Sequence, residues 1–406
     1  MSEMSYLEKL LDGVEVEWLP LGEITKYEQP TKYLVKAKDY HDTYTIPVLT
    51  AGKTFILGYT NETHGIYQAS KAPVIIFDDF TTANKWVDFD FKAKSSAMKM
   101  VTSCDDNKTL LKYVYYWLNT LPSEFAEGDH KRQWISNYSQ KKIPIPCPDN
   151  PEKSLAIQSE IVRILDKFTA LTAELTAELT AELNMRKKQY NYYRDQLLSF
   201  KESEVEWKTL GEIGHFTRGK RFVKTDMLSE GYPCIHYGEM YTYYNVWTNK
   251  TKSFVSHELA SKLRVSEYGD VIIVAAGETI EDIGKGTAWL GKSNVVFHDA
   301  CFSYRCSLNP KYIAYFTRTK IFHDQIKKHI SSGKISAINA NGLSRVKIPM
   351  LSAKEQARIV DILDKFDTLT NSITEGLPRE IELRQKQYEY YRDLLFSFPK
   401  PETISN

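Results

Sequence analysis

The sequence predicts an α+β protein in which two globular mixed α/β domains are separated by two long antiparallel, coiled-coil-like helices. Three observations predict this fold class. The 406 residues are enough for two or three domains. Short segments recur in the same order in both halves of the chain. The segment that closes each half has the apolar spacing of a helix. We therefore expect a tandem repeat with pseudo-twofold symmetry.

The recurring segments belong to a scaffold that was duplicated around two inserts. The recurring pairs are EVEW (15–18, 204–207), LGEI (21–24, 210–213), KIP (142–144, 347–349), IVRILDKF and IVDILDKF (161–168, 359–366), and QYNYYRD and QYEYYRD (189–195, 387–393). The sequence between LGEI and KIP does not visibly repeat, so the two inserts have diverged. YLEKLL at 6–11 resembles YRDQLL at 193–198. Because each repeat closes with that element, we expect the two ends of the chain to lie close together.

These boundaries divide the chain into five segments. They are an N-terminal helical segment (1–18), a first globular domain (19–153), a central helical spacer (154–206), a second globular domain (207–350) and a C-terminal helical spacer (351–406).

The central spacer is predicted to be one long helix, because it has no Pro or Gly from Ser154 to Phe200. Its apolar residues recur every three or four positions: Ile161, Leu165, Phe168, Leu171, Leu175, Leu179 and Leu183. At ~1.5 Å per residue such a helix would span about 70 Å. The tetrapeptide TAEL occurs three times between 172 and 183. Each unit overshoots the 3.6-residue turn by about 40°, so we expect its Leu and Ala to face a partner helix while Glu174, Glu178 and Glu182 point outward.

The C-terminal spacer carries the same apolar rows from Ala353 to Phe398, at Ile359, Leu363, Phe366, Leu369 and Ile373. It is interrupted at Gly376-Leu377-Pro378. Proline removes a helical hydrogen bond and clashes with the preceding turn, so we expect a kink or two abutting helices there.

Both globular domains mix strand-like and helix-like patterns. In the first domain, strands are expected at 44–49 and 73–77 and a helix at 110–118. In the second, strands are expected at 269–277 and 294–304 and a helix from Tyr312 to Ile330. Each domain ends in a basic, polar loop that is followed by a KIP strand.

The composition excludes several classes of protein. The net charge of +1 excludes a uniformly basic DNA-coating protein, although basic residues exceed acidic ones by 8 between 207 and 350. No apolar run approaches the ~20 residues of a membrane helix, and the acidic start does not resemble a signal peptide. The five cysteines form no CxxC pair, so we expect a reducing cytoplasm and neither zinc nor disulfides.

No catalytic site can be assembled from the sequence. Methyltransferase, dinucleotide-binding and helicase motifs are absent, as is a convincing set of nuclease carboxylates, and the nine histidines have no metal-ligand spacing. Residues 286–293 match the P-loop pattern, but the next residues along the chain alternate like a strand, so we reject the match. Asp78-Asp79 is interpreted as a turn at a strand end. We expect a non-catalytic subunit.

The repeats and the TAEL units together resemble the specificity subunit of type I restriction–modification enzymes, in the subfamily with TAEL repeats in the central spacer. The resemblance covers essentially the whole chain. It implies two target-recognition domains that each read half of a split double-stranded DNA sequence. It also implies that the helices hold two methyltransferase subunits, which are joined by restriction/translocation subunits. S-adenosylmethionine, ATP and Mg²⁺ are then expected on those partners, and no cofactor on this chain.

Base reading calls for Arg or Lys opposite guanine, Asn or Gln opposite adenine, and further phosphate contacts. In the first domain the matching loop residues are Lys53, Thr54, Tyr59, Asn61, Lys131, Arg132, Gln133 and Asn137. In the second they are Arg218, Lys220, Arg221, Tyr241, Tyr243, Lys328, Ser332, Lys334, Asn339, Asn341 and Arg345, with Gly219 allowing close backbone approach. The helix residues expected at the spacer and partner surfaces are Phe168, Leu171, Leu175, Leu179, Leu183 and Phe366.

Two alternatives remain open at this stage. Basic runs are commonly solvated faces, and tyrosine clusters are commonly core or rim packing. The chain as a whole is alternatively a coiled-coil adaptor whose two globular domains bind proteins, which explains the helices but not the Arg, Lys, Asn and Gly in the loops.

Overall fold

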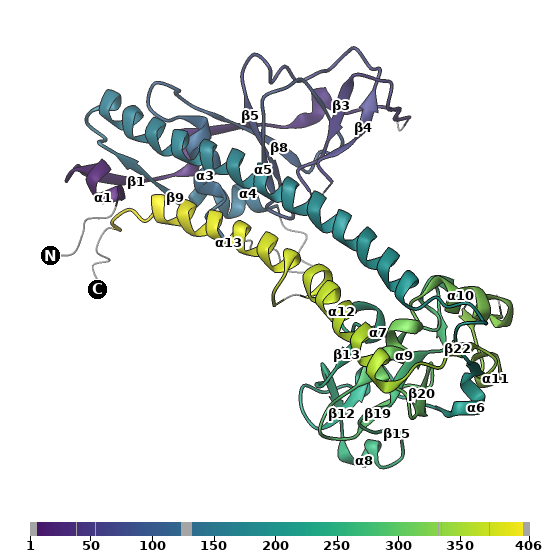
Figure 1. Ribbon diagram of the computed structural model, residues 1–406. Coiled ribbons are helices and arrows are strands. Elements are labelled where there is room, and N and C mark those ends of the chain that lie inside the picture. Colours follow the sequence, from purple (N-terminus) through teal and green to yellow (C-terminus); the bar gives the residue numbers. More distant parts are fainter. Residues whose placement is uncertain are drawn as a thin grey trace. The chain divides into compact units, whose positions relative to one another are not determined.

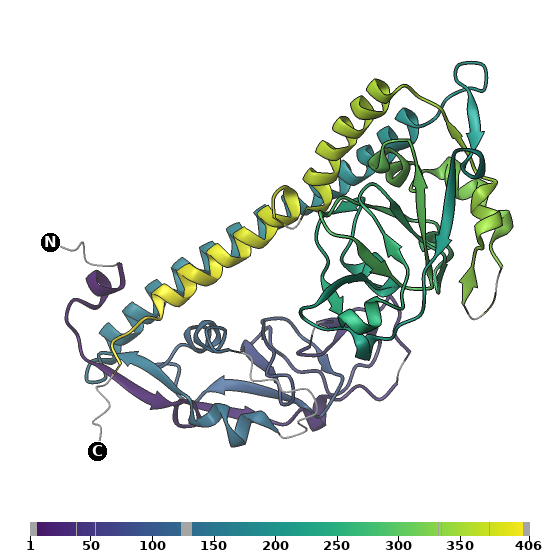
Figure 2. The ribbon, with the colours of Figure 1, turned by 90° about the horizontal axis from the view of Figure 1, so that it is seen from below.

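The computed structural model describes residues 6–37, 39–52, 54–122, 132–331, 333, 335–372 and 374–400. The chain forms two compact units (Figures 1 and 2). The first contains Met1–Thr176 and Leu383–Asn406, and the second contains Ala177–Glu382. Each unit combines β-sheets with helices, which confirms the predicted mixed α/β class.

The described residues of the first unit form three sheets. Their strand orders are β1-β9, β2-β8-β5-β6 and β4-β3-β7. The strands are β1 (Val16–Pro20), β2 (Thr25–Glu28), β3 (Ile46–Leu49), β4 (Ile56–Thr60), β5 (Val74–Asp78), β6 (Asn84–Val87), β7 (Lys92–Ala93), β8 (Met98–Ser103) and β9 (Lys142–Pro146). The helices here are α1 (Tyr6–Leu11), α2 (Leu21–Ile24), α3 (Leu111–Leu118) and α4 (Gln133–Ser136). The strands predicted at 44–49 and 73–77 are thus confirmed as β3 and β5, and the helix at 110–118 as α3.

In the second unit, the residues that the structure describes form four sheets, with orders β10-β22, β11-β20-β16-β18-β13, β14-β12-β19-β15 and β17-β21. The strands are β10 (Trp207–Thr209), β11 (Gly214–Arg218), β12 (Tyr232–Ile235), β13 (Trp247–Thr248), β14 (Ser253–Val255), β15 (Val265–Ser266), β16 (Val271–Val274), β17 (Ala276–Gly277), β18 (Gly286–Trp289), β19 (Val295–Phe297), β20 (Cys301–Cys306), β21 (Ser336–Ala337) and β22 (Lys347–Pro349). Its short helices are α6 (Leu210–Ile213), α7 (Tyr237–Thr242), α8 (His257–Ala260), α9 (Pro310–Phe316), α10 (Lys320–Ile326) and α11 (Ala340–Ser344).

Three predictions for the second unit were too simple. The run at 269–277 is two strands, β16 and β17, which belong to different sheets. The run at 294–304 is two strands, β19 and β20, because the chain turns where the His298 ring nitrogen accepts a hydrogen bond from the Ala300 amide at 3.1 Å. The helix predicted from Tyr312 to Ile330 breaks between α9 and α10. The Thr319 side chain caps a new helix start there by accepting a hydrogen bond from the Phe322 amide.

The repeated segments form the same local structure in both units. The strand that contains the tryptophan of EVEW pairs antiparallel with the KIP strand, as β1 with β9 in the first unit and β10 with β22 in the second. LGEI forms the one-turn helices α2 and α6, whose first residues Leu21 and Leu210 are buried. The rejection of the P-loop is confirmed, because Gly286–Trp289 is the buried strand β18 and leads into β19.

The central spacer forms one helix, α5 (Pro151–Leu197). It begins three residues before the predicted Ser154 because proline is tolerated in the first turn. The C-terminal spacer forms two helices, α12 (Ala353–Asn371) and α13 (Leu377–Leu395), which confirms the predicted interruption. Gly376 between them has φ = 82°, a left-handed conformation that favours glycine.

Within each unit, α5 runs antiparallel to the C-terminal helices. In the first unit Phe168 lies 5.6 Å from Tyr391 between ring centroids, and the hydroxyl of Thr169 donates to that of Tyr388 at 3.1 Å. In the second unit the ring of Tyr193 stacks on Phe366 at 5.6 Å. The two ring pairs are related by the repeat, since Phe168 corresponds to Phe366 and Tyr193 to Tyr391.

A carboxylate anchor joins a long helix to the globular domain in each unit. In the first unit Asp166 of α5 accepts hydrogen bonds from Lys112 at 2.9 Å and from the Tyr116 hydroxyl at 2.6 Å, both on α3. In the second unit, the lysine and tyrosine of α9, Lys311 and Tyr315, contact Asp364 of α12 at 2.7 and 2.6 Å. Burial and the hydrogen bond to the carboxylate raise the pKa of each tyrosine. The same geometry therefore fixes both domains to their helices.

The described parts of the chain ends share one core in the first unit. Leu7 and Leu11 of α1 belong to the same buried cluster as Phe396 and Phe398. The indole nitrogen of Trp18 donates a hydrogen bond to the Pro399 carbonyl at 2.9 Å. This agrees with the expectation, drawn from the resemblance of 6–11 to 193–198, that the ends lie close together.

Candidate nucleic-acid interface

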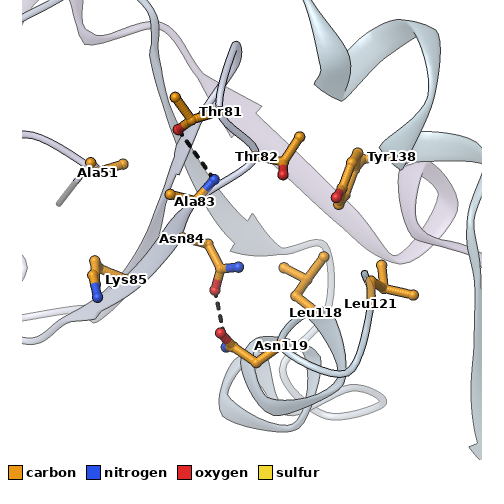
Figure 3. Close-up of a pocket in the computed structure, with 11 residues that line it drawn as sticks. Ala51, Thr81, Thr82, Ala83, Asn84, Lys85, Leu118, Asn119, Leu121 and Tyr138 are labelled. Carbon is orange, nitrogen blue, oxygen red and sulfur yellow. Dashed lines mark hydrogen bonds between the residues drawn. The ribbon is translucent and has the colours of Figure 1, made fainter. Parts of the chain in front are cut away.

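The loops singled out in the first domain follow β3, β4 and the helix α3. Thr54 and Asn61 are exposed, and Tyr59 on β4 is partly buried. The loop at 51–52 borders a cavity of about 370 Å³, which is also lined by residues 81–85 and by the end of α3 (Figure 3). The side chain of Asn119 donates to that of Asn84 there, at 3.1 Å (Figure 3). Lys53 and Lys131 lie outside the described residues.

Asp79 holds the loop at 132–137, which follows α3 in this domain. The Trp134 amide donates to the Asp79 carboxylate at 2.9 Å, and the Gln133 amide donates to the Asp79 carbonyl at 2.8 Å. The same carboxylate lies 3.1 Å from the Lys99 ammonium, and the side chains of Asp79 and Lys99 are both 0% exposed. It also lies 3.9 Å from the Arg132 guanidinium. A buried charge needs such a partner. This arrangement fixes the backbone of α4 while leaving the Arg132 side chain about half exposed.

Sequence reasoning missed this anchor. Asp78-Asp79 is confirmed as a strand-end turn, because the Asp78 side chain accepts from the amides of Phe80 and Thr81. However, Lys99 comes to Asp79 only through the pairing of β5 with β8, which no sequence pattern indicates. Asn137, also predicted, lies between α4 and a 3-10 helix and shares a side-chain contact of 3.4 Å with Gln133.

The basic residues after β11 in the second unit form an exposed surface. Arg218 donates through Nε to the Asp299 carbonyl at 3.0 Å, and Lys220 donates to the Lys262 carbonyl at 2.8 Å. Arg221 is exposed. Arg264, which sequence reasoning did not single out, donates to the Arg218 carbonyl at 2.8 Å. The group therefore joins four basic side chains from two segments.

Gly219 does permit a close approach, but the approach is to its own chain. A Cβ atom at Gly219 would lie 2.1 Å from the carbonyl oxygen of His298. The glycine is thus required for packing between the loop and the β19–β20 turn. This corrects the interpretation that it allows approach to a ligand.

The segment at 327–345, which includes β21 and α11, presents further polar side chains. Lys328, Asn341 and Arg345 are exposed. Asn339 is the N-cap of α11, and its side chain accepts a hydrogen bond from the Gly342 amide at 2.9 Å. Ser332 and Lys334 lie outside the described residues.

The predicted tyrosine cluster divides into packed and exposed members. Tyr241 donates to the Ala276 carbonyl at 2.9 Å and, with Tyr237 and His298, lines a cavity of about 500 Å³. Burial raises the pKa of Tyr241. Tyr243 is 52% exposed, with the Lys252 ammonium 5.4 Å from its ring centroid. Burial lowers the pKa of His236 and of His298, whose rings lie 4.7 Å apart.

The helix residues predicted at the spacer surface differ in exposure. Leu171 is 52% exposed, and Leu175, Leu179 and Leu183 are partly buried. Phe168 and Phe366 make the ring contacts described above. The tyrosine pairs of the two QYxYYRD segments, Tyr192, Tyr193, Tyr390 and Tyr391, are all exposed.

The described residues contain neither a metal-binding cluster nor a helix that could span a membrane. No group of three or more His, Cys, Asp or Glu among them could hold a metal ion. No helix in that part of the chain has the length and apolar character needed to cross a membrane.

The comparisons with known proteins agree with one another. The family model for the type I restriction modification DNA specificity domain matches twice, at residues 13–185 and 202–383. The EcoR124I/EcoR124II specificity subunit of Escherichia coli is 67% identical over 425 aligned positions, which cover 100% of both chains. The EcoprrI specificity subunit of the same species is 35% identical and covers 92% of this chain and 93% of its own.

A solved structure from work on complex assembly and conformational transition of the type I R-M system contains a chain of the same fold. It superposes with a TM-score of 0.60 at 15% identity and covers 94% of this chain and 97% of that one. This likeness is one of fold. The doubled family match and the relative of 67% identity show that the chain belongs to the specificity subunits of type I restriction–modification systems.

Proposed function

We propose that this chain recognises DNA for a type I restriction–modification complex by reading a split target, one half with each unit. The observation that carries the proposal is the doubled scaffold. Both units repeat the strand pair, the one-turn helix and the Lys–Tyr–Asp anchor, while the loops attached to them differ in sequence. A constant frame with two different loop sets suits the reading of two different half-sites.

The exposed side chains in these loops have the chemistry for that task. Arg218, Lys220, Arg221 and Arg264 supply donors for guanine edges or for phosphates, and Asn341 supplies an amide suited to adenine. In the first domain Arg132 and Asn61 are the corresponding groups. The excess of eight basic residues between 207 and 350 supports stronger electrostatic attraction at the second domain than at the first.

The helices are proposed to bind methyltransferase subunits, two in number, through which restriction/translocation subunits join. Exposed tyrosine pairs occupy equivalent positions of the two repeats, at Tyr192–Tyr193 and Tyr390–Tyr391. Two copies of one surface would accept two copies of one partner. Leu171 adds exposed apolar area on α5.

We further assign the chain to the subfamily in which TAEL copies set the spacing between half-sites. The three copies lie within α5, and a helix converts residue number into length and rotation. An additional copy would therefore move and turn one reading domain relative to the DNA.

Methyl transfer and cleavage are proposed to occur on the partner subunits, with S-adenosylmethionine, ATP and Mg²⁺ bound there, in the cytoplasm. Assaying the isolated chain for methyl transfer tests this directly. We expect no transfer without the methyltransferase subunits, and transfer by the chain alone would contradict the assignment.

DNA recognition is separated from a purely structural adaptor role by salt-dependent binding. We expect the complex with methyltransferase subunits to bind duplex DNA, with log affinity falling linearly as log salt rises. An adaptor whose domains bind only proteins would leave the DNA affinity of the methyltransferase subunits unchanged when this chain is added.

A further inference from the structure

A second polar cavity lies within the second unit, between the end of α5 and the helices α9 and α10. Its volume is about 290 Å³. The lining residues are Tyr190, Arg194, Met240, Tyr241, Tyr244, Asn245, Lys285, Arg318 and His323. At about 30 Å³ per water molecule, the space accommodates one small solute together with several waters.

The lining of this cavity is basic. Arg194, Lys285 and Arg318 contribute positive charge, and no carboxylate is among the lining residues. Arg194 pairs with Asp195 at 3.1 Å, and Lys285 pairs with Asp282. Burial lowers the pKa of His323, and the charges of Lys285, Arg194 and Arg318 lower it further, while Asp195 opposes them. These four basic groups thus lie close enough to repel one another.

Arg318 is the member that forms no salt bridge with a described residue, although the charge of Asp367, which accepts a hydrogen bond from Asn245 at 2.7 Å, opposes the fall in the Arg318 pKa. In the described part of the chain its guanidinium donates to the carbonyls of Gly286 and Ala314, the latter at 2.9 Å. Burial lowers its pKa, because a charged group surrounded by protein loses its hydration. An anion in the cavity would compensate that loss.

Tyr190 provides an independent observation. Its side chain is 6% exposed, and its buried hydroxyl has no hydrogen-bond partner among the described residues. Buried hydroxyls in native proteins are nearly always hydrogen-bonded. A hydroxyl in a basic cavity can donate to an anion, which would remove the deficit.

The first unit shows that the scaffold does not require this charge. The K-Y-x-x-Y segments at 112–116 and 311–315 align Asn119 with Arg318. Asn119 satisfies its position with neutral hydrogen bonds, to Asn84 at 3.1 Å and to the Tyr115 carbonyl at 2.7 Å. The basic cavity is therefore a property of the second repeat.

We propose that this cavity binds a phosphate-type oxyanion, held by the guanidinium of Arg318, the ammonium of Lys285 and the hydroxyl of Tyr190. The oxyanion is a backbone phosphate of bound DNA or a free phosphate. The site rests on the cavity and its charges and goes beyond the proposed reading of bases.

The test is calorimetric titration of the full chain with inorganic phosphate at constant ionic strength. We compare Lys285→Gln and Tyr190→Phe with Lys320→Gln, an exposed lysine of α10 that does not line this cavity. The loss of one charge-assisted contact should weaken phosphate binding roughly tenfold in each of the first two variants, and the third should match the parent. Arg318 is left in place because it also holds backbone carbonyls.

Failure of the parent to bind phosphate beyond an equal ionic strength of chloride would overturn the proposal. So would a Lys285→Gln variant that binds phosphate as tightly as the parent. Repeating the titration with saturating duplex DNA separates the two sources. If bound DNA weakens the binding of inorganic phosphate, and if the salt slope of DNA binding is lower by about one in Lys285→Gln, the ligand is a DNA phosphate. If inorganic phosphate binds equally well in the presence of DNA, the ligand is free phosphate. If the complex of this chain with its methyltransferase subunits bound no DNA at all, the proposed function in reading DNA would be wrong, while the result for inorganic phosphate would still stand.

Discussion

Removal of one TAEL unit, residues 176–179, perturbs the proposed spacing function most specifically. The three units lie within the continuous helix α5, so the deletion shortens it by about 6 Å and rotates the downstream part of the helix by about 400°, a net turn of ~40°. One base pair advances DNA by about 3.4 Å and turns it by ~35°. The rotation therefore matches one base pair, and the shift lies between one and two. We expect the unread spacer to shorten by one base pair, or at most two, with both half-sites unchanged.

Mapping of methylated bases in cells that carry the variant with its partner subunits measures this outcome. None of the residues from 166 to 189 is fully buried, so the deletion removes no core side chain. Glu178→Gln, which changes the exposed charge of the same segment but not its length, is the matched control and should leave the spacer as it is. An unchanged spacer in the deletion variant, or a change in either half-site, would refute the ruler mechanism.

Three further predictions concern single residues. Arg221→Ala should weaken DNA binding by the complex and lower the salt slope by about one, as measured by titration at several salt concentrations; an unchanged slope would remove this residue from the phosphate contacts. Asp364→Asn should lower the free energy of unfolding by about 1–3 kcal/mol in urea denaturation, because it weakens two hydrogen bonds to a carboxylate, whereas the exposed Asp361→Asn on the same helix should have little effect. Burial alone would raise the pKa of Asp270, but the hydrogen bonds and charge of Arg305 lower it. The native pKa lies below the unfolded one, so this stabilisation is present above the unfolded pKa and is lost as the pH falls through the native value. The denaturation midpoint of Asp270→Asn should consequently fall less steeply on acidification than that of the parent, and parallel curves would contradict this.

The helices and the repeat could be predicted from the sequence because both leave local signals. The absence of Pro and Gly indicated α5, and Gly376 with Pro378 indicated the break between α12 and α13. The EVEW and KIP segments marked the strand pairs at the beginning and end of each globular domain. These features depend on the helix propensities of residues and on the recurrence of segments, and both can be read from a single sequence.

The contacts that hold the loops depend instead on residues far apart in the chain. The anchors of Asp166 and Asp364 join helices separated by about fifty residues. The K-Y-x-x-Y pattern, which occurs at both 112–116 and 311–315, is a sequence feature that could have indicated these two anchors. Asp79 and Lys99 leave no such signal, because they meet through strand register. The sequence indicated that Gly219 permits a close approach of the backbone, but its packing against His298 follows from tertiary structure alone.

Exchange of residues 210–346 for the corresponding domain of a relative with a different target tests the central claim most directly. The measurement is a genome-wide map of methylated sites for the parent and for the hybrid, each with its methyltransferase partner. We predict a bipartite motif in both, with one half and the spacer length retained and the other half replaced. A change in both halves, or in neither, would contradict the assignment of one half-site to each unit.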